Sequence, residues 1–256
     1  MAEADSDYYD HARVALLDLF PHAPTRLLDV GCGSGATGAA AKARWPGVET
    51  IGIEIVPEAA QRAKARLDRV ILGSAETLDL TAAGIAGVDG VLLLDILEHL
   101  VDPWRFLERL HAVLDPAAMV VASIPNIANL WLLDELAAGR FAYTSDGLLD
   151  MTHLRFFTRQ SIRALFDGAG YDIERWERIT DGRVDDATRR RILGVTLPVP
   201  LAGRVAGRRV TVRGVDDDAY HDLRTIQFTL VARPRTGKTG GIAGDGPRRV
   251  EEAIDE

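Results

Sequence analysis

The stretch LLDVGCGSGATG, residues 27–38, contains the residue types that can bind a nucleotide-like ligand. Read from Gly33, GSGATG is a formal match to the G-x-G-x-x-G pattern of dinucleotide-binding proteins. A strand that ends in such a turn and then opens a helix presents free backbone N–H groups at the carboxyl edge of a sheet. In open α/β folds, ligands bind at this edge. The spacing therefore predicts a ligand loop and leaves the ligand open.

Two carboxylates near this loop narrow the choice of ligand. Asp29 lies just before Gly31, where it would repel the pyrophosphate of a dinucleotide. S-adenosylmethionine has an ammonium, a sulfonium and no phosphate, so Asp29 favours this cationic methyl donor. Glu54 ends the second predicted strand, about 20 residues beyond the glycines, where a carboxylate can accept both ribose hydroxyls. Both cofactors share this second feature, which indicates an adenosine ribose without choosing between them.

Two further clusters could carry out proton transfer. The first, DILEHL at 95–100, contains Glu98 and His99, and the second, DMTHLRFFTR at 150–159, contains His153. A hydroxyl that accepts a methyl group must lose its proton, which requires a general base or a metal ion. Either histidine could be that base. In the alternative interpretation, Glu98 and His99 only cap a loop and His153 is a hydrogen-bonded lid residue.

The elements that must position these residues alternate between short apolar strands and helix-length segments. Strands are predicted at 26–30, 50–55, 69–73, 90–95, 118–123, 171–179 and 223–232. Helices are predicted at 8–20, 36–45, 57–67, 103–114 and 160–168. Because strands that are apolar on both faces belong to sheets covered on both sides, the pattern predicts an α/β fold with a parallel sheet.

The remaining segments predict one domain with two insertions. We expect the domain to cover 1–233, with a lid insertion at 124–160 and an Arg-rich insertion at 181–221. Within the second insertion, 183–213 has eight Arg against two Asp. This segment is either a solvent-exposed loop without a ligand or a surface that binds an anionic substrate. Gly, charged and small residues dominate 234–256, which we predict to be a disordered tail.

The composition excludes several classes of protein. A net charge of −8 and a pI near 5.3 make nucleic acid an unfavourable partner. The single cysteine, Cys32, cannot form an intramolecular disulfide or a cysteine-based zinc site, which suits a reducing compartment. The first ten residues lack the basic-then-apolar order of a signal peptide. With no apolar run near membrane-spanning length, we expect a cytoplasmic protein without a membrane partner.

Five motifs in register resemble the class I S-adenosylmethionine-dependent methyltransferases. They are LLDVGCGSG (27–35), IGIEI (51–55), ILGSAETLDL (71–80), GVLLLDILEHLVDP (90–103) and GYDIERWERI (170–179). The resemblance implies a Rossmann-like, seven-stranded, mostly parallel sheet with helices on both faces, plus a lid insertion. It also implies a set of cofactor-binding residues: Asp29, Gly31, Cys32, Gly33, Gly35, Glu54, Ile55, Ala75, Glu76, Asp95 and Ile96. Ser74 stands where the family often has Asp, so either Ser74 or Glu76 meets the adenine amine.

The two histidine clusters are similar to those of two branches of this superfamily. These branches are the O-methyltransferases of ubiquinone biosynthesis and the small-RNA 3′-terminal 2′-O-methyltransferases. The resemblance implies that Asp95, Glu98, His99 and His153 could gather a divalent cation of the Mg²⁺ type. Asp95 departs from the branch pattern, which has Glu at that position. A metal-free reaction, with His99 or His153 as general base, is the competing hypothesis.

The expected function is methyl transfer from S-adenosylmethionine to a hydroxyl of a small metabolite. IPN (124–126) and GRFAYTSDGLLDMTHLRFFT (139–158) resemble bacterial methyltransferases associated with glycan and secondary-metabolite pathways, which favours a sugar or glycan precursor. Five aromatic residues could stack on such an acceptor or pack the segment down: Trp131, Phe141, Tyr143, Phe156 and Phe157. Methylation of an amine and a non-catalytic cofactor-binding regulator remain as alternatives.

Overall fold

The structure is a computed structural model, and it describes residues 12–182, 201–205, 208–212 and 217–236. Its centre is a seven-stranded sheet with the strand order β3-β2-β1-β4-β5-β9-β6. The strands are β1 (Arg26–Val30), β2 (Glu49–Glu54), β3 (Arg69–Leu72), β4 (Gly90–Leu94), β5 (Met119–Pro125), β6 (Tyr171–Thr180) and β9 (Thr225–Pro234). The first five pair in parallel, and β9 runs antiparallel to both β5 and β6. The predicted mostly parallel, Rossmann-like sheet is confirmed.

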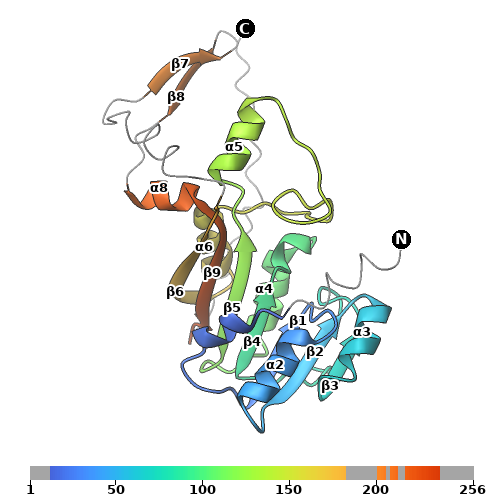
Figure 1. Cartoon of the computed structure of the whole chain (residues 1–256). Helices are drawn as coiled ribbons and strands as arrows, with labels where there is room; N and C mark the ends of the chain where they lie inside the picture. Colours follow the sequence, from blue (N-terminus) through green and yellow to red (C-terminus); the bar gives the residue numbers. More distant parts are fainter. Residues whose placement is uncertain (1–11, 183–200, 206–207, 213–216, 237–256) are drawn as a thin grey trace.

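Helical segments cover both faces of this sheet (Figure 1). On one face, α4 (Pro103–His111) and α6 (Arg159–Gly168) bury Phe106, Leu110 and Phe166 against one side of the strands. The opposite side packs on η1 (Val14–Leu19), α2 (Ala36–Arg44) and α3 (Pro57–Ala63). Alternate strand residues point to the two cores, which is why the strand sequences are apolar on both faces.

The N-terminal segment differs from its predicted form. A helix was predicted over 8–20, but the described part of that range forms only the short 3₁₀ helix Val14–Leu19. Its apolar residues Leu16, Leu17 and Leu19 are still buried against the sheet. Helical spacing therefore identified the buried face, while the helix ends because Phe20, the residue before Pro21, has an extended backbone.

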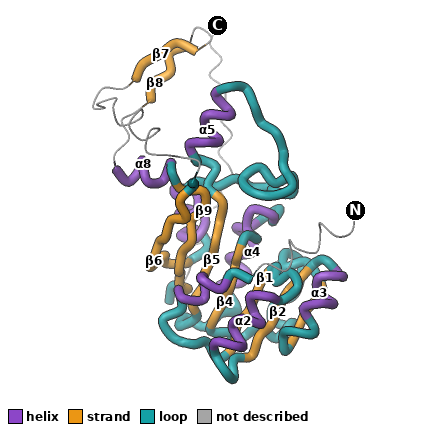
Figure 2. Tube along the Cα trace, in the orientation of Figure 1, coloured by secondary structure: helices purple, strands orange, loops and turns teal. Residues whose placement is uncertain are grey.

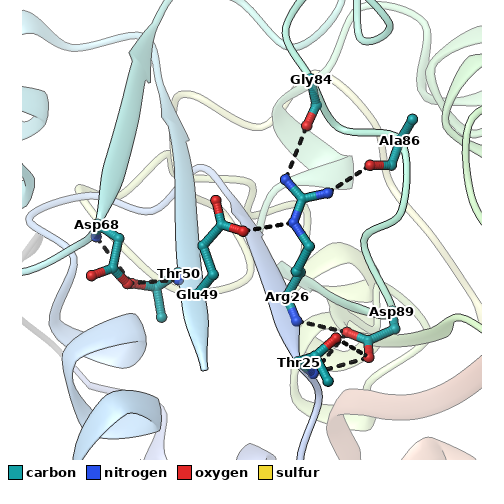
Figure 3. A network of polar contacts seen from close by, with 8 residues as sticks. All are labelled: Thr25, Arg26, Glu49, Thr50, Asp68, Gly84, Ala86 and Asp89. Carbon is teal, nitrogen blue, oxygen red and sulfur yellow. Dashed lines mark hydrogen bonds and ion pairs between the residues drawn. The ribbon is translucent and has the colours of Figure 1, made fainter. Parts of the chain in front are cut away.

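Polar contacts at the amino ends of the strands fix their register, as Figure 3 shows. The Arg26 guanidinium donates to Glu49 Oε2 at 2.6 Å and to the carbonyl oxygens of Gly84 and Ala86. Asp89 accepts the backbone N–H groups of Thr25 and Arg26. These contacts join the starts of β1, β2 and β4 at one edge and leave the opposite edge to the loops that could bind a ligand.

The predicted lid insertion connects β5 to α6. It contains α5 (Leu130–Ala137), which lies beyond the carboxyl end of β5 and is followed by a long loop (Figure 2). Leu132 on α5 packs on Leu148 and Leu149 of that loop. The insertion thus has a small apolar core of its own, separate from the two cores of the sheet.

The second insertion and the predicted tail are described only in part. β7 (Leu201–Val205) and β8 (Arg208–Val212) form a separate two-stranded ribbon, and α8 (Asp217–Leu223) leads into β9. The remainder of the Arg-rich segment lies outside the described residues. Of the predicted tail 234–256, Pro234 ends β9 and the Arg235 N–H donates to the Gly170 oxygen at 2.8 Å, while 237–256 lie outside the described residues.

Candidate active site

The glycine loop between β1 and α2 adopts a backbone that requires glycine. Gly31, Gly33 and Gly35 have φ angles of +72°, +55° and +81°, in the left-handed region. The N–H groups of Gly31 and Cys32 donate to the Ile53 oxygen on β2, at 2.8 and 3.1 Å. The loop is therefore tied to the neighbouring strand at the carboxyl edge of the sheet, and α2 begins directly after Gly35.

Gly31 also marks a close contact across the sheet. A Cβ atom at Gly31 would lie 2.8 Å from Cδ1 of Ile96, which follows β4. Since the strand order changes direction between β1 and β4, this contact lies at the topological switch point, where open α/β sheets bind ligands. The structure thus brings together Gly31 and Ile96, two of the residues predicted to bind the cofactor.

Asp29 and Glu54 form a buried acidic pair under the glycine loop. Asp29 is 5% exposed and Glu54 is 4% exposed. Burial, and secondly the Glu54 carboxylate, raise the pKa of Asp29 to about 7. The Glu54 carboxylate accepts the N–H groups of Gly33 and Val56, both at 2.8 Å. Each Glu54 oxygen keeps a second lone pair for a hydroxyl donor, such as those of a ribose.

Cys32 contributes to the loop through its backbone. Its Sγ packs toward Gly52 on β2, where an added Cβ would lie 2.5 Å from the sulfur. The residue is buried with Ala63 and Leu67, and burial raises the pKa of the thiol well above its usual range. The Cys32 side chain is therefore a small apolar group of the core, and any contact with the cofactor would come from its backbone.

The residues predicted to meet the adenine are Ile55, which follows Glu54, and Ala75 and Glu76, in the loop after β3. Ile55 is 64% exposed, and Ala75 is buried. The Glu76 carboxylate accepts the N–H groups of Val101 and Asp102, at 3.1 and 2.7 Å. Both Glu76 oxygens are thus engaged with the loop before α4.

Ser74 is positioned differently from Glu76. Its Oγ accepts the Glu76 N–H at 3.3 Å, and its carbonyl oxygen accepts the N–H groups of Thr77 and Leu78. The Ser74 hydroxyl can accept a further hydrogen bond, and each Glu76 oxygen also keeps a second lone pair, so both residues remain candidates to meet an adenine amine.

Asp95 follows β4 and is held by residues distant in the sequence. Its φ of +53° is in the left-handed region, the one such angle among the described non-glycine residues. The Arg13 guanidinium pairs with Oδ2, while Ser123 Oγ and Gln227 Nε2 donate to Oδ1. Burial raises the pKa of Asp95, and the Arg13 charge opposes that rise. Sequence reasoning missed Arg13 and Gln227, since nothing in their local pattern links them to Asp95.

Glu98, His99 and His153 come together at the same edge. Each offers one ligand atom, and these three atoms lie within 4.8 Å of one another. The two imidazole rings are 4.8 Å apart between centroids. The N–H groups of Leu154 and Arg155 donate to the Glu98 carbonyl oxygen, at 2.8 and 3.0 Å, which fixes the lid segment to the loop after β4. Asp95, predicted to join this set, lies outside the group that the structure brings together.

Glu98 is the unusual member of this cluster. The residue is 1% exposed, and neither carboxyl oxygen has a hydrogen-bond partner in the described structure. Burial, and secondly the Asp95 carboxylate, raise the pKa of Glu98 well above its usual value. Glu98 and His153 also line a cavity of about 10 Å³, room for about one water molecule. A buried acid without a partner costs free energy, which a proton, a water or a cation at this position would reduce.

The histidines themselves are partly fixed by the lid segment. His99 Nδ1 lies 3.1 Å from Thr152 Oγ1 and 3.2 Å from the Thr152 carbonyl oxygen. His153 Nδ1 lies 3.4 Å from the Leu148 oxygen. Burial, and secondly the neighbouring His99, lower the pKa of His153, which favours its neutral form. A neutral imidazole at this edge can accept a proton.

Comparison with known proteins gives the family. Residues 2–175 match the family described as a methyltransferase domain. A curated relative, trans-aconitate 2-methyltransferase of Methylobacterium radiotolerans, is 31% identical over 104 residues, which cover 41% of this chain and 39% of that protein.

None of the helices in the described part of the chain has the length and apolar character needed to cross a bilayer.

Solved structures agree on the fold. The structure of an S-adenosylmethionine-dependent methyltransferase from Archaeoglobus fulgidus superposes on this chain with a TM-score of 0.55 and 17% sequence identity. The superposition covers 86% of this chain and 91% of that one. A putative methyltransferase solved in complex with the Haloferax volcanii Trm112 activator gives 0.56 at 18% identity, over 92% of each chain. Together with the family match and the glycine loop beside Asp29 and Glu54, these findings show that the chain belongs to the class I S-adenosylmethionine-dependent methyltransferases.

Proposed function

We propose that the protein transfers the methyl group of S-adenosylmethionine to a hydroxyl of a small metabolite, a sugar or glycan precursor. The observation that carries this proposal is the meeting of His99 and His153, from two separate segments, at the edge that also bears the glycine loop. A cofactor site with Asp29 and Glu54 lies on one side of the switch point, and the imidazoles lie beyond β4.

The reaction needs alignment and one proton acceptor. The acceptor oxygen forms a bond to the methyl carbon while the carbon–sulfur bond breaks and the sulfur keeps the electron pair. The hydroxyl proton passes to an imidazole of His99 or His153. Much of the rate acceleration in such a displacement comes from holding the two reactants in line, which is the task of the loop and the lid segment.

Aromatic side chains of the lid support an acceptor with a ring. Phe141, Tyr143 and Phe156 are 43%, 61% and 42% exposed, and the Phe141 and Tyr143 rings contact edge to face at 5.3 Å. The other two aromatic candidates have structural roles: Phe157 is buried in the main core, and Trp131 packs on the core of the insertion. Exposed aromatic faces are suited to stacking on a sugar or another ring.

Substitution of the histidines tests the proposal. His99→Ala, His153→Ala and the double variant should bind S-adenosylhomocysteine as the wild type does, and should lose about 10²-fold or more of kcat with a hydroxyl acceptor. Unchanged turnover in the double variant would contradict a base role. Wild-type binding of cofactor with no turnover on any acceptor would instead favour the regulatory alternative.

Other acceptors give a different outcome in the same variants. The curated relative is named for a carboxylate substrate, and a carboxylate is already deprotonated at neutral pH. An amine acceptor also needs a weaker base than a hydroxyl. Full activity of the double histidine variant toward an amino sugar or a tricarboxylate would therefore reassign the acceptor and leave methyl transfer intact.

A metal-assisted form of this reaction is the second candidate. The donor set fits a cation: two imidazoles and a buried carboxyl whose oxygens have no partner among the described residues. Because Mg²⁺ prefers oxygen ligands, two imidazoles suit Mn²⁺, Fe²⁺ or Zn²⁺ better than the predicted Mg²⁺. Such an ion, held by Glu98, His99 and His153, would lower the pKa of a bound hydroxyl.

Titration of the apo protein with MnCl₂, ZnCl₂ and MgCl₂ tests the metal directly. A saturating rise in the unfolding temperature with Mn²⁺ or Zn²⁺, absent in Glu98→Gln, is expected. Glu98→Gln preserves size and removes the anionic ligand, while Glu108→Gln on α4 serves as a surface control. Activity that survives exhaustive chelation, or no metal-dependent shift, would leave the metal-free mechanism.

A further inference from the structure

A short turn of the lid segment, residues 150–153, contacts both histidines of the candidate active site. Thr152 Oγ1 lies 3.1 Å from His99 Nδ1, although the two residues are 53 positions apart in the sequence. The Thr152 carbonyl oxygen lies 3.2 Å from the same nitrogen. Within the turn, the Asp150 carbonyl oxygen accepts the His153 N–H at 3.0 Å. Thr152 therefore meets the His99 ring with two oxygens, and the same turn holds the backbone of His153.

Asp150 fixes this turn from the inside of the insertion. The residue is 3% exposed and directly follows Leu148 and Leu149, which belong to the small apolar core of the insertion. Asp150 Oδ1 accepts the Thr152 N–H at 2.8 Å and the Thr152 hydroxyl at 2.6 Å. Because a carboxylate can only accept hydrogen bonds, the Thr152 hydroxyl gives its single proton to Asp150.

The directions of these hydrogen bonds decide which nitrogen of His99 carries a proton. Since the Thr152 hydroxyl proton is already donated to Asp150, Thr152 Oγ1 can only accept from His99 Nδ1. The Thr152 carbonyl oxygen can also only accept. Both oxygens therefore require a proton on Nδ1. A neutral imidazole protonated on Nδ1 has its free lone pair on Nε2.

We propose that Asp150 and Thr152 are positioning residues that hold His99 in its Nδ1–H tautomer, so that Nε2 takes the proton of the acceptor hydroxyl. When Nε2 gains that proton, the ring becomes a cation and its Nδ1–H bond to Thr152 becomes charge-assisted. The Asp150 carboxylate behind Thr152 favours this positive charge. The inference rests on the proposed function and names the residues that orient the base within it.

NMR of the protein with isotope-labelled histidine tests the tautomer without any acceptor. At about pH 8.5, where imidazoles are neutral, wild-type His99 should be protonated on Nδ1, and His99→Gln identifies its signals by their loss. Thr152→Val removes one of the two acceptors with little change of size. It should lower the ratio of the Nδ1–H to the Nε2–H form about fivefold, the effect of one hydrogen bond. Thr152→Ser keeps the hydroxyl and should retain the wild-type ratio.

Asp150→Asn tests the carboxylate. Asparagine keeps the size of the side chain but can turn its NH₂ group toward Thr152 Oγ1, which frees the hydroxyl proton to point at His99. The ratio of the two tautomers should therefore fall in the same direction as in Thr152→Val.

Thr144→Val and Asp146→Asn are the matched controls. Thr144 is exposed, as Thr152 is, and its hydroxyl donates to the Asp146 carbonyl oxygen at 2.6 Å in the same loop. Thr144→Val thus removes a threonine hydrogen bond of the lid without removing a contact to His99, and Asp146→Asn removes one negative charge. Both controls should keep the wild-type ratio.

S-adenosylhomocysteine separates failure of the inference from failure of the proposed function. Calorimetry should show wild-type affinity for it in every variant. Wild-type His99 protonated on Nε2, an unchanged ratio in Thr152→Val or Asp150→Asn, or equal changes in the controls would overturn the inference. Loss of S-adenosylhomocysteine binding in Thr152→Val would also overturn it, because the turn would then support the fold. A wild type that does not bind S-adenosylhomocysteine would instead refute the proposed function, whichever nitrogen of His99 is protonated.

Discussion

Asp29 shows how burial sets the chemistry of a single residue. An aspartate in the unfolded chain titrates near 3.8, whereas burial and Glu54 raise the pKa of Asp29 to about 7 in the native protein. The native state therefore holds this proton more tightly than the unfolded state. Its contribution to stability is complete below about pH 4 and is lost as the pH rises toward about 7.

Asp29→Asn should consequently stabilise the protein while weakening its function. The free energy of unfolding should rise by up to about 4 kcal/mol at about pH 8 and change little at about pH 4, because the amide does not ionise. Urea unfolding at several pH values measures this effect. Binding of S-adenosylmethionine should weaken because the anionic partner of the cationic ligand is gone.

Asp18→Asn is the control that separates the effect of burying a carboxyl from the effect of removing one negative charge. Asp18→Asn changes the same charge on an exposed residue of η1, whose side chain is 64% exposed, and should show no such pH dependence. A stability gain in Asp29→Asn that is equal at all pH values would show that ionisation of Asp29 is not its source.

Gly31 and Gly139 allow backbone strain to be separated from a steric contact. Their φ angles, +72° and +74°, are nearly equal, but a Cβ at Gly139 meets nothing within 4 Å while one at Gly31 meets Ile96. Gly139→Ala should cost about 1–2 kcal/mol of stability from strain alone. Gly31→Ala should cost more and should also weaken cofactor binding.

The double variant Gly31→Ala with Ile96→Val tests the cause of the extra loss. Valine lacks the Cδ1 atom that the new Cβ would approach, so the pair should recover part of the stability and affinity. Equal stability losses in Gly31→Ala and Gly139→Ala would mean that the Ile96 contact has no effect.

At the scale of elements, Glu76 joins two loops at the ligand edge. Its carboxylate accepts the N–H groups of Val101 and Asp102, and Arg109 of α4 donates to the Glu76 and Leu78 carbonyl oxygens. The loop after β3 and the start of α4 therefore form one unit. The sequence predicted a helix that begins at Pro103, and in the structure Asp102 caps this helix by accepting the Arg105 N–H, but the sequence gave no sign of the connection through Glu76.

Glu76→Gln should loosen this unit. A glutamine places its NH₂ group against one of two N–H donors, so stability should fall by about 1–3 kcal/mol. Hydrogen exchange at the Val101 and Asp102 amides should accelerate. Glu135→Gln is the control. Glu135 lies on α5, and this substitution breaks only its exposed ion pair with Arg140, so it should alter neither measurement. Unchanged amide protection in Glu76→Gln would contradict the coupling.

At the scale of the whole molecule, the described ribbon of the second insertion is not part of the seven-stranded sheet. β7 and β8 pair only with each other among the described strands, whereas Asp181 N–H donates to the Arg224 oxygen at 2.8 Å and closes the base of the insertion. α8 is also anchored, since Asp222 pairs with Arg178 at 2.8 Å. The hydrogen bond from Asp181 to Arg224 and the ion pair of Arg178 with Asp222 therefore hold β6 near β9 without β7 or β8.

Replacement of 183–215 by a Gly-Ser linker of about eight residues should keep the fold and S-adenosylhomocysteine binding. The segment 183–213 carries a local charge of +6 within a chain whose net charge is −8. If it binds an anionic acceptor, the deletion should raise KM for that acceptor and remove its salt dependence, with kcat at saturation little changed. Loss of cofactor binding would show that the insertion supports the sheet.

The sequence by itself determined the parts that depend on local pattern. Apolar runs, helix caps and the glycine turn act over a few residues, so the sheet, the position of α4 and the loop at Gly31 were predictable. The family resemblance added the seven-stranded, Rossmann-like arrangement and the set of cofactor-binding residues, and the family match and the solved structures confirm the fold.

Only the tertiary structure decided which charged groups are already engaged. Arg13 pairs with Asp95, Glu76 is held by the start of α4, and the Glu98 carboxyl has no hydrogen-bond partner among the described residues, although it lies beside two imidazoles. Asp95 also accepts a hydrogen bond from Gln227, which lies 132 positions away in the sequence. Burial and partner choice depend on how distant segments cross at the sheet edge, and local sequence carries no record of that crossing.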